Sequence, residues 1–415
     1  MTSNDPLHLA RNTMGAGLTD TEDQVDMKRL RGYRLGRVQE QLCQRDLGAV
    51  VLFDPINIRY ATGSRNMTVW VLHNAARCAF VPAEGKVVLF EFPRCEFLSK
   101  GLETISEVRP AKPWYYFGVG ENIAAQAIAW ADEIADLVTE HCGGNRRLAL
   151  DNGNFHGTRA LEALGIELHD GQEVLEQARV IKSADEIACM NVAITACETG
   201  MARMHEALEP GITENELWSL LHQANIAMGG EWIETRLLAS GGRTNPWFHE
   251  SSDKVIRAGE LVAFDSDLIG PFGYCADISR TYFCGPGRPS DEQRRLYTIA
   301  YEQIETGIAR LKPGMSFREY SEAASRMPNE FVARSYSVAA HGVGMCDEWP
   351  AVVYMRDWNE SAYDGVFEPG MTMCIESYIG VEGGLEGVKL EEQVLVTESG
   401  IQRLSTFPYE DALLA

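Results

Sequence analysis

The sequence of 415 residues lacks several features that would assign it to a broad class of protein. No run of apolar residues approaches the roughly 20 needed to span a bilayer. The N-terminus, Met-Thr-Ser-Asn-Asp-Pro, has neither the basic nor the apolar region of a secretion signal. The ten cysteines form no CxxC pair, which favours reduced thiols over a disulfide framework. We therefore expect a cytoplasmic protein rather than a membrane protein or a disulfide-rich secreted one.

Net positive charge is also missing. The chain has 37 Lys and Arg against 60 Asp and Glu, which gives a formal charge of −23. Such a chain is a poor partner for nucleic acid and for anionic membranes, so we predict that it binds neither. Its 45% hydrophobic and 23% charged residues are ordinary for globular proteins. The length leaves room for two domains with sizeable cores.

Turns and hydrophobic periodicity divide the chain into an arm over residues 1–26, an N-terminal domain over 27–182 and a catalytic domain over 183–415. The N-terminal domain begins with an amphipathic helix from Met27. We then predict a buried strand over 48–53, a turn at Asp54-Pro55, a short return segment over 57–63, strands over 79–82, 86–91 and 147–150, and helices over 121–141 and 155–164. This alternation predicts an α/β fold.

The catalytic domain is predicted to open with two helices, because Ser183-Ala-Asp-Glu186 and Thr213-Glu-Asn-Glu216 have the pattern of a capping box. A second pair of helices is predicted over 292–311 and 317–327. Strands are expected to follow each pair. The sequence therefore predicts an α+β domain whose two similar halves face one another across a site with pseudo-two-fold symmetry.

Six potential metal ligands are spread over the last third of the chain: Asp265, Asp267, Asp277, His341, Glu376 and Glu391. Because side chains alternate along a strand, Asp265 and Asp267 should point the same way from a strand over 261–267. A turn over 270–273 would then bring Asp277 back beside them. Alternation does not choose between Glu391 and its neighbour Glu392. Five carboxylates around one imidazole favour a first-row divalent metal, often bound as a pair.

The segments around these residues resemble the signature motifs of the pita-bread metallopeptidases, which include methionine aminopeptidase, prolidase, aminopeptidase P and creatinase. The similar segments are Ser240–His249, Gly259–Asp265, Gly273–Phe283, His341–Gly344, Pro369–Glu376 and Gly387–Glu391. Residues 55–63 and 180–187 resemble the leading domain of the creatinase and prolidase branch. The resemblance implies a dinuclear centre, selects Glu391 over Glu392, and implies a homodimer that pairs through its N-terminal domains.

Three departures from this pattern argue against a peptidase. Glu348 stands seven residues after His341, where the peptidases carry a second histidine that protonates the scissile peptide. Asp267 adds a sixth ligand, which would weaken the Lewis acidity of the metals. Ser377 replaces a proline that commonly follows the first glutamate. The sequence thus retains a metal centre but lacks a residue on which peptide hydrolysis depends.

The altered pattern resembles the iron-dependent dimethylsulfoniopropionate lyases of marine bacteria, the DddP type, which form dimethyl sulfide and acrylate. The resemblance implies a small sulfonium carboxylate substrate, Asp347 as the catalytic base and Tyr336 as a substrate-site residue. It also implies two divalent metal ions, with iron expected, although the ligands alone also admit manganese, cobalt or zinc. Because aromatic faces bind cations, Trp247 and Trp349 are further candidates for substrate binding, and His249 matches the family's substrate-side histidine.

Purely structural roles stay open for these residues, and other functions stay open for the whole chain. Asp347 could simply cap a turn, and aromatic residues beside a site are often plain core. A prolidase-like Xaa-Pro dipeptidase is the alternative enzyme, supported by the ligand set and opposed by Glu348. A metal-free binding protein is a third hypothesis, opposed by the retention of every ligand.

Overall fold

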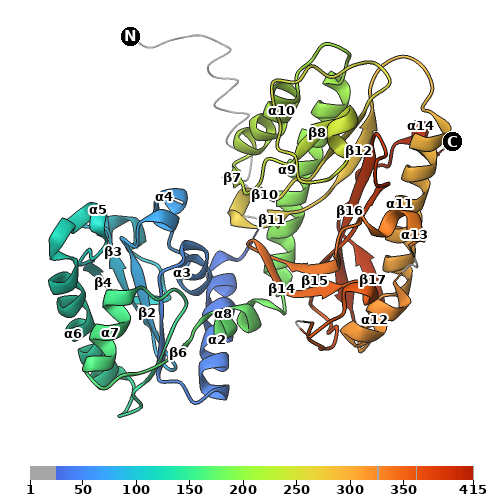
Figure 1. Ribbon diagram of the computed structural model, residues 1–415. Helices are drawn as coiled ribbons and strands as arrows, with labels where there is room; N and C mark the ends of the chain where they lie inside the picture. The colour runs from blue at the N-terminus through green and yellow to red at the C-terminus, as the bar shows by residue number, and fades with distance from the viewer. Residues whose placement is uncertain (1–24, 325–326, 361, 415) are drawn as a thin grey trace, which may run out of the picture.

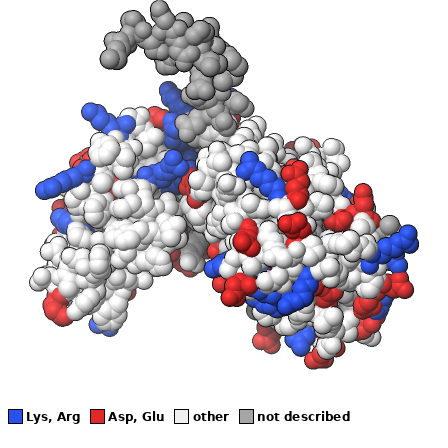
Figure 2. Space-filling view, turned by 90° about the horizontal axis from the view of Figure 1, so that it is seen from above, with Lys and Arg blue, Asp and Glu red and all other residues white. Residues whose placement is uncertain are grey.

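The computed structural model describes residues 25–324, 327–360 and 362–414, which form two lobes (Figure 1). The predicted arm lies outside the described residues up to residue 24. Asp26, at its end, caps the first described helix, because its Oδ1 accepts the backbone N–H of Arg29 at 3.0 Å. Among the helices of the described residues, none is long and apolar enough to cross a membrane. Figure 2 shows acidic and basic side chains interspersed over the C-terminal lobe, at the right.

The N-terminal lobe is a mixed six-stranded sheet with helices on both faces. In sheet order the strands are β4 (Ile105–Pro110), β3 (Val87–Glu91), β2 (Cys78–Pro82), β1 (Ala49–Leu52), β5 (Arg147–Leu150) and β6 (Glu167–Asp170). The main helices are α2 (Met27–Gln44), α3 (Pro55–Thr62), α4 (Thr68–His73), α6 (Ile123–His141), α7 (Phe155–Ala163) and α8 (Gln172–Arg179). Val50 packs in the core beneath α2, whereas Val51 packs in the core beneath α6. The predicted α/β fold is confirmed.

The turn and return segment predicted after β1 are wrong, because residues 55–62 form helix α3. Asp54 caps it: one carboxylate oxygen accepts the N–H groups of Ile56 at 2.7 Å and Asn57 at 3.2 Å. Pro55 stands in the first helical turn, and Gly63, with φ of +80°, ends the helix. A capping aspartate before proline and a glycine after the last turn are helix signals that periodicity over so short a segment concealed.

The C-terminal lobe has the predicted order of two helix pairs, each followed by strands. The helices α9 (Ala184–Ala207), α10 (Glu214–Ala227), α11 (Asp291–Arg310) and α12 (Phe317–Ala323) begin at capping boxes on Ser183, Thr213, Ser290 and Ser316. Four N-terminal N–H groups of each helix need partners, and each box supplies a partner for one of them while its glutamate or glutamine accepts the N–H of the capping residue. Helix α12 is shorter than predicted, since it ends at Ala323 instead of reaching residue 327.

Three sheets of this lobe meet where the predicted ligands gather. The first sheet contains β8 (Leu238–Ser240), β9 (Leu261–Phe264) and β12 (Arg280–Phe283), and the second β7 (Trp232–Ile233), β10 (Leu268–Ile269) and β11 (Cys275–Ala276). The third, in sheet order, contains β14 (Asp347–Val353), β13 (Val338–Val343), β15 (Thr372–Gly380), β16 (Gly387–Thr397) and β17 (Gly400–Arg403). The N–H of Glu391 donates to the carbonyl of Ser279 at 3.2 Å, so β16 lies against the segment that follows Asp277.

Candidate metal centre

Three aspartates of the centre come from the connections between short strands. Strand β9 ends at Phe264, and the chain kinks before β10, where Asp267 has φ of +35°. The predicted continuous strand over 261–267 is therefore wrong, and alternation is not what brings Asp265 and Asp267 together. The kink does this instead: carboxylate oxygens of Asp265, Asp267 and Asp277 lie within 4.8 Å of one another. The predicted hairpin is present, with β12 antiparallel to β9.

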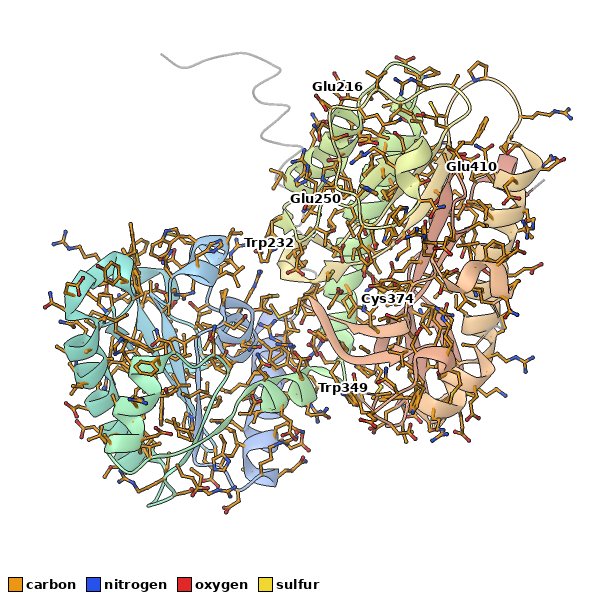
Figure 3. All side chains as sticks on the ribbon, in the orientation of Figure 1. Glu216, Trp232, Glu250, Trp349, Cys374 and Glu410 are labelled. Atoms are coloured by element: carbon orange, nitrogen blue, oxygen red, sulfur yellow. The ribbon has the colours of Figure 1, made fainter. Side chains whose placement is uncertain are left out.

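The histidine and the two glutamates come from three adjacent strands. Glu376 of β15 lies directly opposite Glu391 of β16, and His341 of β13 is paired with Cys374 of β15. The Nε2 atom of His341 lies 3.2 Å from Glu391 Oε1, 3.4 Å from Asp277 Oδ2 and 3.7 Å from Glu376 Oε1. The structure thus brings all six predicted ligands into one cluster, in the middle of the lobe where Cys374 is labelled in Figure 3.

Glu392, which alternation could not exclude as a ligand in place of Glu391, projects from the opposite face of β16. Its carboxylate accepts a hydrogen bond from Arg280 Nη2 at 2.6 Å and another from the hydroxyl of Ser405. Because adjacent strand residues point to opposite faces, Glu391 alone reaches the cluster.

Buried and unpartnered oxygens indicate that the cluster fits metal ions. Asp277 Oδ1 and Glu376 Oε1 are buried and have no hydrogen-bond partner within the described part of the chain. Burial, together with neighbouring carboxylates, raises the pKa of Asp277 and of Asp267 well above the usual range. Burial also raises the pKa of Glu376 to about 8, against the lowering effect of Lys389. Divalent cations would satisfy these oxygens and favour ionised carboxylates, and one imidazole among carboxylates suits first-row metals.

Lys389 is a member of the centre that the sequence reasoning missed. Its ammonium is fully buried and donates to Glu391 Oε2 at 2.8 Å, Glu376 Oε2 at 2.9 Å and Ser279 Oγ at 3.0 Å. It also lies 3.1 Å from Asp265 Oδ2. The period of two along a strand could have found it, since Lys389 stands two residues before Glu391 and shares its face. One fixed positive charge therefore belongs to the cluster.

Asp347, the predicted base, lies beside the cluster and is not one of the six predicted ligands. Its carboxylate lies 3.8 Å from His341 Nδ1, and its side chain is 54% exposed. Partial burial raises the pKa of Asp347, as do Glu391 and Asp265, against the opposing effect of His341. Glu234, which the sequence reasoning did not identify, interacts electrostatically with Asp347. Burial, and after it the charge of Asp347, raise the pKa of Glu234 to about 7.

Two of the predicted substrate residues, Tyr336 and Trp247, lie together at the side of the cluster. The ring of Tyr336 has Lys389 Nζ at 5.6 Å from its centroid and the ring of Phe248 at 5.5 Å. Trp247 is buried in the same small core, stacked on Tyr378 at 5.9 Å. His249, near them in sequence, has its Nδ1 at 3.0 Å from the carbonyl of Pro246. Aromatic faces therefore stand next to a group of acids.

Trp349 lies elsewhere, where β14 approaches α8 (Figure 3). Its ring packs on Phe317 at 5.4 Å and Tyr363 at 6.0 Å, and its backbone N–H donates to Glu176 at 2.8 Å. These contacts are those of a packing residue.

Glu348, which replaces the second histidine of the peptidases, points away from the ligands. Its carboxylate is 2.7 Å from Lys182 Nζ and 3.1 Å from Arg179 Nε, and its side chain is only 1% exposed. Asp347 and Glu348 are neighbours at the start of β14, so their side chains project to opposite faces.

Comparisons with known proteins agree with this architecture. The model of metallopeptidase family M24 matches residues 188–398, and that of the creatinase/prolidase N-terminal domain matches residues 34–181. The chain is 44% identical to the dimethylsulfoniopropionate lyase DddP of Roseovarius nubinhibens over 394 residues, which are 94% of this chain and 88% of that protein. It is 40% identical to the DddP protein of Roseobacter denitrificans over 397 residues, 94% of this chain and 89% of that protein.

Peptidases are less similar in sequence but share the fold. The Xaa-Pro dipeptidase of Pyrococcus furiosus is 30% identical over 239 residues, 56% of this chain and 65% of that protein. The solved structure of an Xaa-Pro dipeptidase from Bacillus anthracis matches with a TM-score of 0.73 at 22% identity, over 92% of this chain and 99% of that one.

Proposed function

Because the chain belongs to metallopeptidase family M24 and, within it, to the dimethylsulfoniopropionate lyases of the DddP type, we propose that it cleaves dimethylsulfoniopropionate to dimethyl sulfide and acrylate. The observation that carries the proposal is the similarity to two such lyases over nearly the whole chain. The alternative, an Xaa-Pro dipeptidase, has the same fold and is supported by the predicted ligand set.

The reaction is a β-elimination, and it needs a base rather than an activated water. The substrate carries a sulfonium on its β carbon and a carboxylate at its other end. The carboxylate of Asp347 takes a proton from the α carbon, the electron pair of that C–H bond forms the double bond, and the C–S bond breaks with its electrons left on sulfur. Dimethyl sulfide leaves as a neutral molecule and acrylate keeps the carboxylate. Asp347 suits the role because it stands beside the ligands without being one of them.

Two divalent metal ions, with iron as the expected metal, would be held by Asp265, Asp267, Asp277, His341, Glu376 and Glu391. When bound, they supply positive charge that binds the substrate carboxylate and stabilises the negative charge developing next to the α carbon. The pKa of Asp347 is raised above its ordinary value, which makes its carboxylate a stronger base. A stronger base removes a proton from carbon more favourably.

The sulfonium end has no hydrogen-bond donor, so aromatic faces and negative charge are its natural partners. Tyr336 and Phe248 offer such faces beside the cluster, each worth roughly 0.5–2 kcal/mol towards a cation. Trp247, whose ring lies 6.4 Å from that of Phe248, and His249, which follows Phe248 in the chain, remain candidate substrate-binding residues. We further propose a homodimer, as the resemblance implies, and a cytoplasmic location, which the free cysteines favour.

The peptidase alternative is disfavoured by the position of Glu348. A peptidase needs a proton donor on the substrate side of the metals, but this carboxylate is buried between Lys182 and Arg179. A metal-free binding protein is disfavoured by the buried oxygens of Asp277 and Glu376 that lack partners in the described structure.

The test measures both activities on the same preparation. Purified protein, loaded anaerobically with ferrous iron, is incubated with dimethylsulfoniopropionate, and dimethyl sulfide in the headspace and acrylate in solution are quantified. We expect equal amounts of the two products and no proline from Xaa-Pro dipeptides. Proline release without dimethyl sulfide would reverse the choice between the two enzymes.

A further inference from the structure

An ion-pair network behind the active site joins the two lobes. The side chain of Glu348 is almost fully buried and lies between two cations, Lys182 at 2.7 Å and Arg179 at 3.1 Å. Arg179 is the last residue of α8, and Lys182 stands in the short segment before α9, where the chain passes from one lobe to the other. The N–H of Lys182 also donates to the carbonyl of Gly370 at 2.9 Å. The segment between the lobes is therefore fixed to the catalytic lobe at two points.

The same carboxylate shapes the loop between the ligand His341 and the base Asp347. Glu348 Oε1 accepts the N–H of Met345 at 3.0 Å. A side chain on Gly344 would place its Cβ 2.4 Å from both carboxylate oxygens, so the loop backbone packs directly on the charge. Only glycine permits that approach.

A further contact holds the strand just beyond the base. Glu176 of α8 accepts the N–H of Trp349 at 2.8 Å and pairs with Arg179 at 2.5 Å. Two carboxylates and two cations thus balance one another across the junction between α8 and β14. Glu348, Arg179 and Lys182 are buried, whereas Glu176 is partly exposed, and the three buried charges are tolerated only because they are paired.

We propose that Glu348, held by Arg179 and Lys182, is a positioning residue for Asp347, so that the junction between the lobes sets the direction of the catalytic base. Asp347 and Glu348 are adjacent on β14 and project to opposite faces, so fixing one carboxylate on the junction side fixes the backbone from which the other projects. The inference rests on the proposed function, in which Asp347 is the base. Glu348, which stands where the peptidases carry a histidine, would then position the catalytic base.

The experiment compares Glu348→Gln and Lys182→Gln, singly and together, with a matched control. The amide introduced by Glu348→Gln would keep the shape and the acceptor for Met345 but lose the charge. We expect kcat for dimethyl sulfide release to fall at least roughly tenfold in each single variant, with KM and bound metal changed less than about twofold. Because both residues act through one network, the double variant should fall much less than the product of the two single effects.

The control is Glu91→Gln in the N-terminal lobe. Glu91, the last residue of β3, forms an equally buried pair at 2.7 Å with Arg77, which directly precedes β2, and both side chains are 0% exposed. It should lower the melting temperature by a similar amount and leave kcat unchanged. If Glu348→Gln does not fold, the test rests on Lys182→Gln. We expect Lys182→Gln to fold, because Arg179 still pairs with the buried carboxylate of Glu348 in that variant.

The outcomes separate this inference from the proposed function. A wild-type protein that releases no dimethyl sulfide overturns both. A wild-type lyase whose Glu348→Gln and Lys182→Gln variants keep kcat within about twofold, or whose losses match those of Glu91→Gln, overturns the positioning role alone.

Discussion

The acidic cluster makes the metal-free protein sensitive to pH in a definite direction. Burial raises the pKa of Glu376 from its ordinary 4.5 to about 8, since the opposing charge of Lys389 does not offset it. The folded chain therefore keeps a proton that the unfolded chain releases, so the stability this proton gives is present at low pH and is lost as pH rises towards 8. Asp267 and Asp277 are shifted the same way. The pKa of Glu391 is lowered by Lys389 and His341 in spite of burial, so it titrates below this window.

The magnitude follows from the shift of Glu376. At about 1.4 kcal/mol for each pKa unit, raising the pH from about 5 to about 8 should cost this one residue about 3 kcal/mol of folding stability. For a lobe of this size, that corresponds to a fall in melting temperature of roughly 10 °C. Bound metal ions should abolish the effect, because a nearby cation keeps the carboxylates ionised.

Melting temperatures of chelated and metal-loaded protein, measured between about pH 5 and pH 8, check this expectation. The buried Asp151, whose pKa burial raises to about 7, lies in the N-terminal lobe and contributes to both curves, so the difference between the curves reports the cluster. Glu376→Gln should reduce that difference because glutamine does not titrate. Chelated protein whose melting temperature stays level or rises with pH would refute the reasoning.

Three further predictions concern single side chains. Asp347→Asn should lower dimethyl sulfide release by about 10²–10⁴-fold while metal content and melting temperature stay unchanged, and a variant that keeps a tenth of the activity would exclude Asp347 as the base. Asp267→Asn should weaken binding of one metal ion at least roughly tenfold in a metal titration, whereas unchanged affinity for both ions would remove it from the ligand set. Tyr336→Ala should raise KM for the sulfonium substrate by about 2–30-fold, because the aromatic face that binds the cation is lost. Tyr336→Phe keeps that face and should leave KM unchanged. Equal effects of the two substitutions would show that the hydroxyl, and not the ring face, is needed.

Much of the fold could be predicted because its signals are local. The capping boxes at Ser183 and Thr213 fixed the starts of α9 and α10, since the bonds they make join residues three apart. Helix α3 was missed because eight residues are too few for periodicity, although Asp54 and Gly63 marked both ends. The kink at Asp267 was missed because nothing local distinguishes a strand from a strand interrupted by one residue of positive φ.

The residue types at the site could be read in the sequence, but their surroundings could not. Six candidate ligands were predicted from motifs and lie in one cluster, and strand alternation could also have found Lys389. The position of Glu348 was not, because its partners Lys182 and Arg179 lie 166 and 169 residues earlier in the chain.

The sequence by itself determined which chemical groups this protein has: the carboxylates and imidazole of a candidate metal centre, and an aspartate, Asp347, next to the glutamate that stands where the peptidases carry a histidine. The tertiary structure decided which of them meet. It placed Asp347 beside His341, turned Glu348 to the junction between the lobes and put the ammonium of Lys389 among the ligands. The physical reason is that composition and spacing act along the chain, whereas charge, burial and distance between groups depend on how distant segments pack.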